Sequence, residues 1–425
     1  MDNQVEFLYS KFLQSDGVSI DSRTIEPDNL FFGIVGEHVD GGMYAEQALE
    51  KGASFAVVQD EKYLTGPRMI LVPDCQKALQ ELAIFHRGRF NKKKIVFALT
   101  GSNGKTTTKE LLFRVLDKKY IVHATKGNYN NHLGVPLTIL DIIPQVEIAI
   151  VEMGANRVGD IAELCNYANP THGLITNIGH AHTETFGGIE GVIRGKSELF
   201  DHLRRNGGQV FINQQDHVLD NMSKRFVDAV KFPTKDVIMT SAHPYVTGKI
   251  GAHSFQSRLI GEYNFGNIAA AVAVGRFFGV PDADIANAIG QYEPSNWRSQ
   301  LIEENELRIL LDAYNANPTS MKAAIENLAS FDGRKIAILG DMQEVEDEQK
   351  AHLEIASILK ENGIGEAYLV GPRSKIIADN LDDARWFKTK AELEAFLKVQ
   401  NFADATILVK ASRSAQLESL KDVLM

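Results

Sequence analysis

Cysteine is scarce in this chain of 425 residues, which contains only Cys75 and Cys165. Two cysteines cannot form a disulfide framework, and their separation matches no metal-binding spacing. No apolar run reaches the roughly 18 residues that a membrane-spanning helix requires. The N-terminus is acidic and no long apolar run follows it, so we expect no signal peptide. These absences predict a cytoplasmic protein without stable membrane insertion.

An excess of positive charge is also missing, because the formal net charge is −10. Such a chain is a poor partner for nucleic acid or for an anionic membrane. Apolar residues make up 44% of the chain and charged residues 24%, which is ordinary for a globular protein. The length suggests about three domains. Any anionic substrate must therefore be held by a local group of cations.

Strand-like and helix-like runs alternate along the chain, which predicts an α/β fold with mostly parallel sheets. We expect three domains: a small N-terminal α/β module at residues 1–75, a central P-loop ATPase-like parallel sheet at 76–304 and a C-terminal Rossmann-like domain at 305–425. In such sheets ligands bind at the carboxyl ends of the strands. The first strand of the last part is not followed by G-x-G-x-x-G, so a dinucleotide site is not favoured there.

A glycine loop between a strand-like and a helix-like run is the strongest functional signal. Residues 95–99 are apolar, and the sequence T-G-S-N-G-K-T follows at 100–106. Backbone N–H groups of such a loop surround an anion at a helix N-terminus. Lys105 would reach the β- and γ-phosphates of ATP, and Thr106 would bind Mg²⁺. The loop is a shortened P-loop, because Leu99 stands in the place of the usual first glycine. The predicted ATP-binding residues are Gly101, Ser102, Asn103, Gly104, Lys105, Thr106 and Thr107.

Other polar residues have a functional and a plainer interpretation. Glu152 ends a predicted strand and could be a second ligand of Mg²⁺, although a glutamate at this place often only faces solvent. His180 and His182 alternate along the chain, so we expect one of them to be functional. Lys196 resembles an ordinary surface lysine of a helix. Arg23 belongs to a polar loop and is either solvated or able to hold a phosphate through a bidentate contact.

Six stretches occur in the order found in the Mur ligases. They are T-G-S-N-G-K-T-T-T-K-E from Thr100, G-N-Y-N-N-H-L-G-V-P from Gly127, E-M-G-A-N from Glu152, N-I-G-H-A-H from Asn177, G-K-S-E-L-F from Gly195 and D-A-Y-N-A-N-P-T-S from Asp312. The chain resembles this family over nearly its whole length, and E-M-G-A-N and Y-N-A-N-P are the most specific stretches. The D-N-P-R motif of the diaminopimelate-adding members is absent.

The resemblance implies an ATP-dependent amide ligase that acts as a monomer. ATP would phosphorylate the carboxylate of a UDP-N-acetylmuramoyl tripeptide, and the amine of D-alanyl-D-alanine would displace the phosphate. Pocket shape, rather than any motif, would select diaminopimelate or lysine as the third residue of the tripeptide. The dipeptide is expected in the third domain, where Glu346 and Ala411 replace glycines that relatives commonly carry.

The resemblance also implies roles for single residues. Lys196 would carry a CO₂-derived carbamate and act in catalysis with Lys105 and His182. Two Mg²⁺ ions would be held by Thr106, Glu152, His182 and the modified Lys196. The nucleotide would also contact Asn267, Arg298, Asp312 and Asn315, and the UDP-substrate would contact Ser22, Arg23, Asn130 and Asn131. His180 has no assigned role.

Two rival functions use the same P-loop. A folate polyglutamate ligase performs the same chemistry on another acceptor, and a nucleotide switch binds ATP without ligase activity. The expected metal ligands argue against the switch, and the E-M-G-A-N stretch argues against the folate enzyme.

Overall fold

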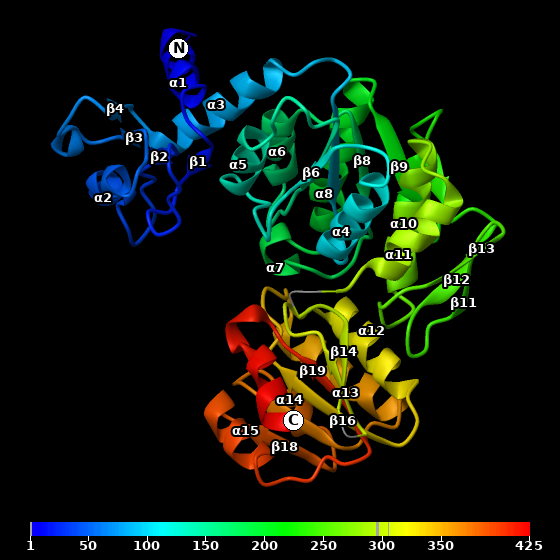
Figure 1. Ribbon diagram of the computed structural model, residues 1–425. Helices are drawn as coiled ribbons and strands as arrows, with labels where there is room; N and C mark the ends of the chain where they lie inside the picture. The colour runs from blue at the N-terminus through cyan, green and yellow to red at the C-terminus, as the bar shows by residue number, and fades with distance from the viewer. Residues whose placement is uncertain (1, 295–296, 305) are drawn as a thin grey trace.

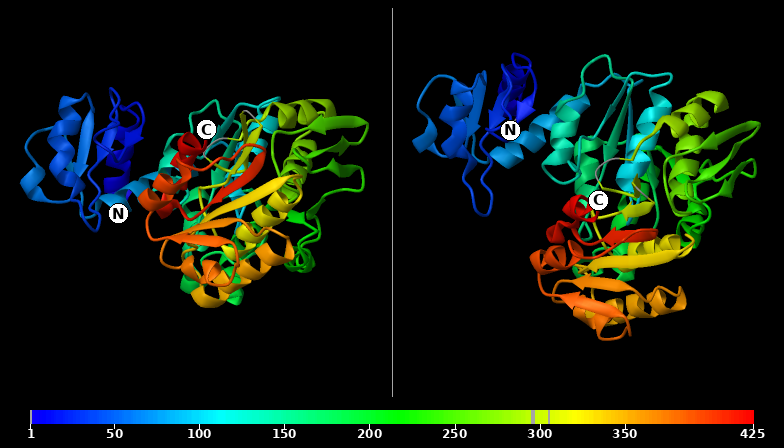
Figure 2. Two further views of the ribbon diagram at one scale, coloured as in Figure 1. Left: turned by 90° about the horizontal axis from the view of Figure 1, so that it is seen from below. Right: turned by 60° about the horizontal axis from the view of Figure 1, so that its bottom comes forward.

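The computed structural model describes residues 2–294, 297–304 and 306–425, and these residues form four β-sheets (Figure 1). The N-terminal sheet lies at one end of the molecule and is joined through the long helix α3 (Cys75–Gly88) to the central sheet (Figure 2). The C-terminal sheet lies against another side of the central part. The predicted α/β fold class with mostly parallel sheets is confirmed.

The N-terminal sheet is small and fully parallel, with the strand order β1-β2-β3-β4. Its elements are α1 (Asp2–Phe12), β1 (Val18–Ser19), β2 (Leu30–Phe32), α2 (Ala45–Glu50), β3 (Phe55–Val58) and β4 (Met69–Leu71). Helix α1 packs on α3, where the rings of Tyr9 and Phe85 are 5.0 Å apart. Because α3 also belongs to the core beneath the central sheet, this contact anchors the N-terminal part.

The central sheet has six parallel strands in the order β10-β9-β8-β5-β7-β6. Its strands are β5 (Ile95–Thr100), β6 (Val122–Ala124), β7 (Ile148–Glu152), β8 (His172–Ile175), β9 (Gln209–Asn213) and β10 (Val230–Phe232). The helices are α4 (Lys105–Leu116), α5 (Gly134–Leu140), α6 (Asp160–Ala168), α7 (Thr183–Phe186), α8 (Ile189–Arg205), α9 (His217–Ser223), α10 (Asn264–Phe277) and α11 (Asp282–Gln291).

Both faces of the central sheet are buried, as its strand sequences require. Along β5, Val96 and Ala98 enter the core that contains α3, α6 and α8, whereas Phe97 and Leu99 enter the core that contains α4, α10 and α11. Side chains that alternate between two apolar faces need helices on both sides of a parallel sheet. The sheet therefore presents its polar carboxyl edge, and not its faces, to ligands.

The C-terminal sheet has the strand order β14-β15-β19-β16-β17-β18. Only the edge pair β14–β15 is antiparallel among these strands. The elements are β14 (Gln300–Glu304), β15 (Leu307–Leu311), α12 (Pro318–Ala329), β16 (Arg334–Gly340), α13 (Glu348–Glu361), β17 (Ala367–Val370), α14 (Lys375–Ala378), β18 (Ala384–Phe387), α15 (Lys390–Leu397), β19 (Ala405–Lys410) and α16 (Lys421–Leu424).

Some elements were not apparent from the sequence. The antiparallel sheet of β11 (Val237–Ser241), β12 (Thr247–Ile250) and β13 (His253–Gln256) lies in a region without clear periodicity. The edge strands β14 and β18 are half exposed, so they lack the apolar runs of the inner strands. Within the part of the chain that is described, no helix is both long and apolar enough to cross a membrane.

Candidate active site

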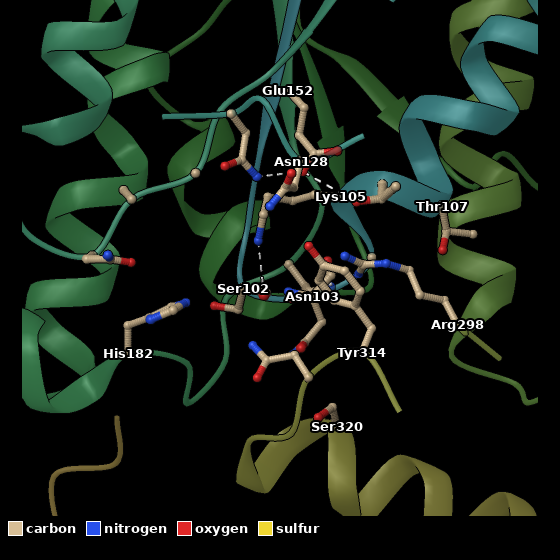
Figure 3. Close-up of a pocket in the computed structure, with 18 of the residues that line it drawn as sticks. Ser102, Asn103, Lys105, Thr107, Asn128, Glu152, His182, Arg298, Tyr314 and Ser320 are labelled. Carbon is tan, nitrogen blue, oxygen red and sulfur yellow. Dashed lines mark hydrogen bonds between the residues drawn. The ribbon is translucent and has the colours of Figure 1, made fainter. Parts of the chain in front are cut away.

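A cavity of about 1010 Å³ lies between the carboxyl edges of the central and C-terminal sheets. Residues after β5, β7 and β8 contribute to its central wall, and residues after β15, with Lys410 at the end of β19, contribute to the opposite wall. Figure 3 shows Glu152 and Lys105 at one end, with Arg298 and Tyr314 on one side and His182 on the other. The cavity thus lies where parallel α/β sheets bind ligands.

Two glycines allow the loop after β5 to close tightly. Gly101 has φ +146°, and a Cβ there would lie 1.9 Å from Oγ1 of Thr176. Gly104 has φ +76°, and a Cβ there would lie 2.5 Å from Oδ1 of Asn267. Gly104 precedes α4, and no side chain caps this helix. The first N–H groups of α4 are therefore available for an anion, which the helix dipole also favours.

Lys105 is the cation of this loop, and it is folded back in the structure. Its Nζ donates to the carbonyl oxygen of Gly101 at 2.8 Å. Burial lowers the pKa of Lys105 to about 8, and Arg298 acts in the same direction while Glu152 opposes them. The guanidinium of Arg298 lies 3.6 Å from the ring centre of Tyr314, which holds this second cation at the cavity wall.

Glu152 ends β7 and is only 1% exposed, so the solvent-facing interpretation is wrong. Its Oε1 accepts from Nδ2 of Asn130 at 2.8 Å and lies 3.4 Å from Oγ1 of Thr106. Its other oxygen, Oε2, is buried without a hydrogen-bond partner. A buried carboxylate oxygen without a partner is costly unless a cation binds it. The Thr106–Glu152 pair is therefore suited to a hard cation.

Lys196 is buried in the middle of α8 and is 1% exposed, so the surface-lysine interpretation is also wrong. Its Nζ donates to the carbonyl oxygen of Ala155 at 3.3 Å, and Ala155 itself lines the cavity. Burial holds the pKa of Lys196 well below its ordinary value, and the charge of Lys105 adds to this effect. Burial of this kind favours the neutral, nucleophilic form of a lysine amine.

His182 lines the cavity from the loop between β8 and α7, whereas His180 is exposed. The backbone N–H of His180 donates to Oγ1 of Thr319 at 3.1 Å, so this residue joins the two walls through its main chain. His182 Nδ1 forms an ion-pair contact with the carboxylate of Glu344. One histidine of the pair therefore lines the cavity and the other is exposed, although His182 has φ +57° and the chain is not extended there.

The C-terminal wall is tied directly to the phosphate loop. Nδ2 of Asn317 donates to Oδ1 of Asn103 at 2.8 Å, and the backbone of Asn103 is held by Asn177. In the same wall Lys410 Nζ contacts the carboxylate of Asp312 and donates to the carbonyl oxygen of Asn315 at 3.0 Å. These contacts bring the predicted nucleotide residues of both sheets to one cavity.

Most of the residues predicted from the sequence line this cavity. They are Ser102, Asn103, Gly104, Lys105, Thr106, Thr107, Asn130, Asn131, Glu152, His182, Asn267, Arg298, Asp312 and Asn315. Gly101 and Lys196 are not among the lining residues, and Ser22 and Arg23 lie away from the cavity, in the N-terminal part. Arg23 is paired with Asp21, where Nη2 of Arg23 is 2.7 Å from Oδ2 of Asp21, and the hydroxyl of Ser22 donates to Oε1 of Gln47 at 3.1 Å.

Two lysines and one tyrosine at or near this site were not predicted from the sequence. Lys410 and Tyr314 line the cavity, and Tyr314 belongs to the D-A-Y-N-A-N-P-T-S stretch that resembles the Mur ligases. Lys109 is 1% exposed, and its Nζ donates to the carbonyl oxygen of Thr125 at 2.7 Å. Thr125 Oγ1 in turn accepts from the backbone N–H of Glu152 at 3.0 Å. The run Lys105–Glu110 is polar throughout, so the sequence held no local signal for this buried support.

Three family models match successive parts of the chain. They describe a Mur ligase family catalytic domain at residues 14–87, a Mur ligase middle domain at 99–275 and a Mur ligase glutamate ligase domain at 297–413. The chain belongs to the Mur ligase family. This Mur ligase is 35% identical to the UDP-N-acetylmuramoyl-tripeptide–D-alanyl-D-alanine ligase of Bacillus subtilis, over 96% of this chain and 93% of the relative. The ligase of the same name from Escherichia coli is 32% identical over 95% and 92% of the two chains.

Solved structures agree with this family. MurF from Acinetobacter baumannii superposes with a TM-score of 0.86 and 29% identity, covering 99% of this Mur ligase and 98% of that chain. MurF from Thermotoga maritima, solved in complex with ADP, gives a TM-score of 0.84 with 26% identity and 97% coverage of both chains. Escherichia coli FolC is 16% identical with a TM-score of 0.61 and shares the fold alone.

The lowered pKa of Lys105 predicts a pH dependence of nucleotide binding by this Mur ligase. The cationic fraction of Lys105 falls as the pH rises through about 8, so ATP affinity should decrease between about pH 7 and 9. Lys105→Met should bind ATP more weakly at pH 7 and lose this dependence, and its turnover should fall by at least about 10²-fold. Calorimetric titration measures the affinity. Lys118→Met, a change at an exposed lysine beyond α4, is the control. An unchanged pH slope in Lys105→Met would contradict the assignment.

Proposed function

We propose that this Mur ligase joins D-alanyl-D-alanine to a UDP-N-acetylmuramoyl tripeptide with the energy of ATP. Full-length similarity to enzymes of that name supports the reaction. The observation that carries the proposal is that one cavity combines a P-loop, a buried carboxylate oxygen without a hydrogen-bond partner (Glu152 Oε2) and residues of a second sheet. A nucleotide switch requires only the first of these features, and the folate enzyme shares only the fold.

In the first step, the carboxylate of the tripeptide attacks the γ-phosphorus of ATP, and ADP leaves. The N–H groups at the start of α4 and the cations Lys105 and Arg298 hold the phosphates and reduce the repulsion between two anions. The product is an acyl phosphate. Phosphate is a far better leaving group than oxide, which is why the carboxylate must be activated before an amide can form.

In the second step, the amine of the dipeptide attacks the acyl carbon, a tetrahedral intermediate forms, and phosphate departs. The dipeptide must approach from the side of the C-terminal wall, because the central wall holds the phosphates. Contacts such as Asn317 to Asn103 and His180 to Thr319 keep the two walls in register. The protein thus contributes chiefly by positioning the reactants and excluding water.

The residues of this site fit magnesium. Oε2 of Glu152 is buried without a partner and lies beside the Thr106 hydroxyl, and hard oxygen donors are the ligands that Mg²⁺ prefers. We assign Thr106, Glu152, His182 and the carbamate of Lys196 to two magnesium sites. When bound, the metal would offset charge on the transferring phosphoryl group.

A carbamate on Lys196 would supply a second anionic oxygen in addition to the Glu152 carboxylate. No group of three His, Cys, Asp or Glu side chains that could hold a metal occurs in the described residues. The neutral Lys196 amine adds to CO₂, which forms a C–N bond and releases one proton. The buried position of Lys196 beside Ala155 favours this reaction, because the lysine cannot ionise easily there.

Each of the three parts of the chain would bind a different reactant or part of a reactant. We assign the UDP end of the substrate to residues 1–75 with Ser22 and Arg23, ATP to residues 76–304, and the dipeptide with part of the nucleotide to residues 305–425. The boundary residues 1 and 305 lie outside the described residues. Asn130 and Asn131 would contact the muramoyl peptide between the first two parts. We further propose that a single chain in the cytoplasm is the active unit.

The proposed reaction is tested by supplying the purified enzyme with ATP, UDP-N-acetylmuramoyl tripeptide and D-alanyl-D-alanine. Phosphate release should require both acceptor and dipeptide, and mass spectrometry should detect the UDP-linked pentapeptide. Tripeptides ending in lysine or diaminopimelate are compared in parallel. Phosphate release with a folate acceptor, or without any acceptor, would contradict the proposal.

The carbamate is tested by replacing Lys196. Lys196→Ala should abolish turnover while ATP still binds, and added acetate should restore part of the activity, because a free carboxylate can occupy the position of the carbamate. Lys196→Arg should remain inactive, since a fixed cation cannot bind metal. Arg194→Ala, an exposed change on the same helix, is the control for general effects on α8. An active Lys196→Arg enzyme would exclude the carbamate.

A further inference from the structure

A loop of the C-terminal sheet reaches the histidine of the proposed metal site. Residues 341–347 connect β16 to α13, and the carboxylate of Glu344 forms an ion-pair contact with Nδ1 of His182. The same loop is attached nearby, because the backbone N–H of Glu346 donates to Oγ1 of Thr183 at 3.2 Å. The Glu344–His182 contact and the neighbouring Glu346–Thr183 hydrogen bond therefore join the loop after β16 of the C-terminal sheet to the segment after β8 of the central sheet.

The backbone on both sides of this contact has an uncommon conformation. His182 has φ +57° and Glu344 has φ +58°, and neither residue is a glycine. Left-handed backbone in such residues persists where the surroundings impose it and occurs often at functional sites.

The two residues differ in their relation to the cavity. His182 is among the residues that line the cavity, and Glu344 is not. The Glu344 carboxylate therefore contacts Nδ1 of His182 from outside the cavity. Histidines that bind metals usually donate their second ring N–H to a carboxylate or carbonyl, which fixes the tautomer and the ring orientation. A carboxylate on Nδ1 is the partner expected for an imidazole whose other nitrogen binds a metal.

We propose that Glu344 is the positioning residue of His182: its carboxylate accepts the Nδ1–H and keeps the lone pair of Nε2 available for the metal. This inference rests on the proposed function, which assigns magnesium to His182. Because Glu344 belongs to the C-terminal sheet and His182 to the central sheet, docking of the two sheets completes the metal site. Metal binding and closure of the two walls are thereby coupled.

The test measures binding of Mn²⁺ by electron paramagnetic resonance in the presence of a non-hydrolysable ATP analogue. His182→Asn defines the part of the Mn²⁺ binding that depends on His182. Glu344→Ala should weaken that part by about 10- to 100-fold. Glu344→Gln should weaken it less, because its amide oxygen still accepts a hydrogen bond. Glu346→Ala, a change of the neighbouring carboxylate, should alter it by less than about twofold.

A second measurement reports the tautomer directly and does not depend on catalysis. The ¹⁵N resonances of His182, assigned by their loss in His182→Asn, should show a proton on Nδ1 at about pH 8, where an ordinary imidazole is neutral. In Glu344→Ala the population should shift toward the Nε2–H form, and in Glu344→Gln it should shift less, because the amide oxygen still accepts from Nδ1–H.

The outcomes separate this inference from the proposed function. If His182→Asn weakens Mn²⁺ binding and Glu344→Ala does not, the positioning role is wrong while the metal assignment stands. If His182→Asn leaves Mn²⁺ binding unchanged, the metal assignment fails, and the role of Glu344 fails with it. A wild-type His182 protonated on Nε2 also overturns the inference. Glu344→Gln keeps the test valid should Glu344→Ala fail to fold.

Discussion

Repulsion between two anions is the constraint on which this site depends. A carboxylate must reach a phosphoryl group that already carries negative charge, and the chain itself has a net charge of −10. The positive charge that offsets this repulsion is concentrated in the cavity. A helix N-terminus, Lys105 and Arg298 surround one end of the cavity, and a buried Glu152 oxygen offers a place for a cation. Because these groups are partly or fully buried, their few charges act more strongly than they would at the surface.

Support for these groups comes from polar residues buried behind them. Lys109 holds the carbonyl of Thr125, whose hydroxyl holds the backbone of Glu152. Asn130 holds the Glu152 side chain, and Asn317 reaches the phosphate loop from the other sheet. Because buried donors and acceptors are costly when unpaired, these networks favour one arrangement over others. The same contacts make the site depend on how the central and C-terminal sheets are docked.

The sequence revealed the local features of the fold and of the site. The phosphate loop could be predicted because strand, glycines and helix follow one another, and the proximity of Glu152 to it because the carboxyl ends of parallel strands share an edge. The burial of Lys196 could not be predicted, since the face that a helix buries depends on its neighbours. The contacts of Asn103 with Asn317 and of His182 with Glu344 join residues far apart in the chain, and no local pattern reports them.

The account rests on an acyl phosphate formed in this cavity, and oxygen transfer tests it most directly. The terminal carboxylate of the tripeptide is labelled with ¹⁸O in both oxygens, and the enzyme is supplied with ATP and D-alanyl-D-alanine. Because the carboxylate oxygen that attacks phosphorus leaves with the phosphate, each released phosphate should carry one ¹⁸O and the nucleotide product should be unlabelled ADP. Unlabelled phosphate, or labelled AMP together with pyrophosphate, would contradict the account.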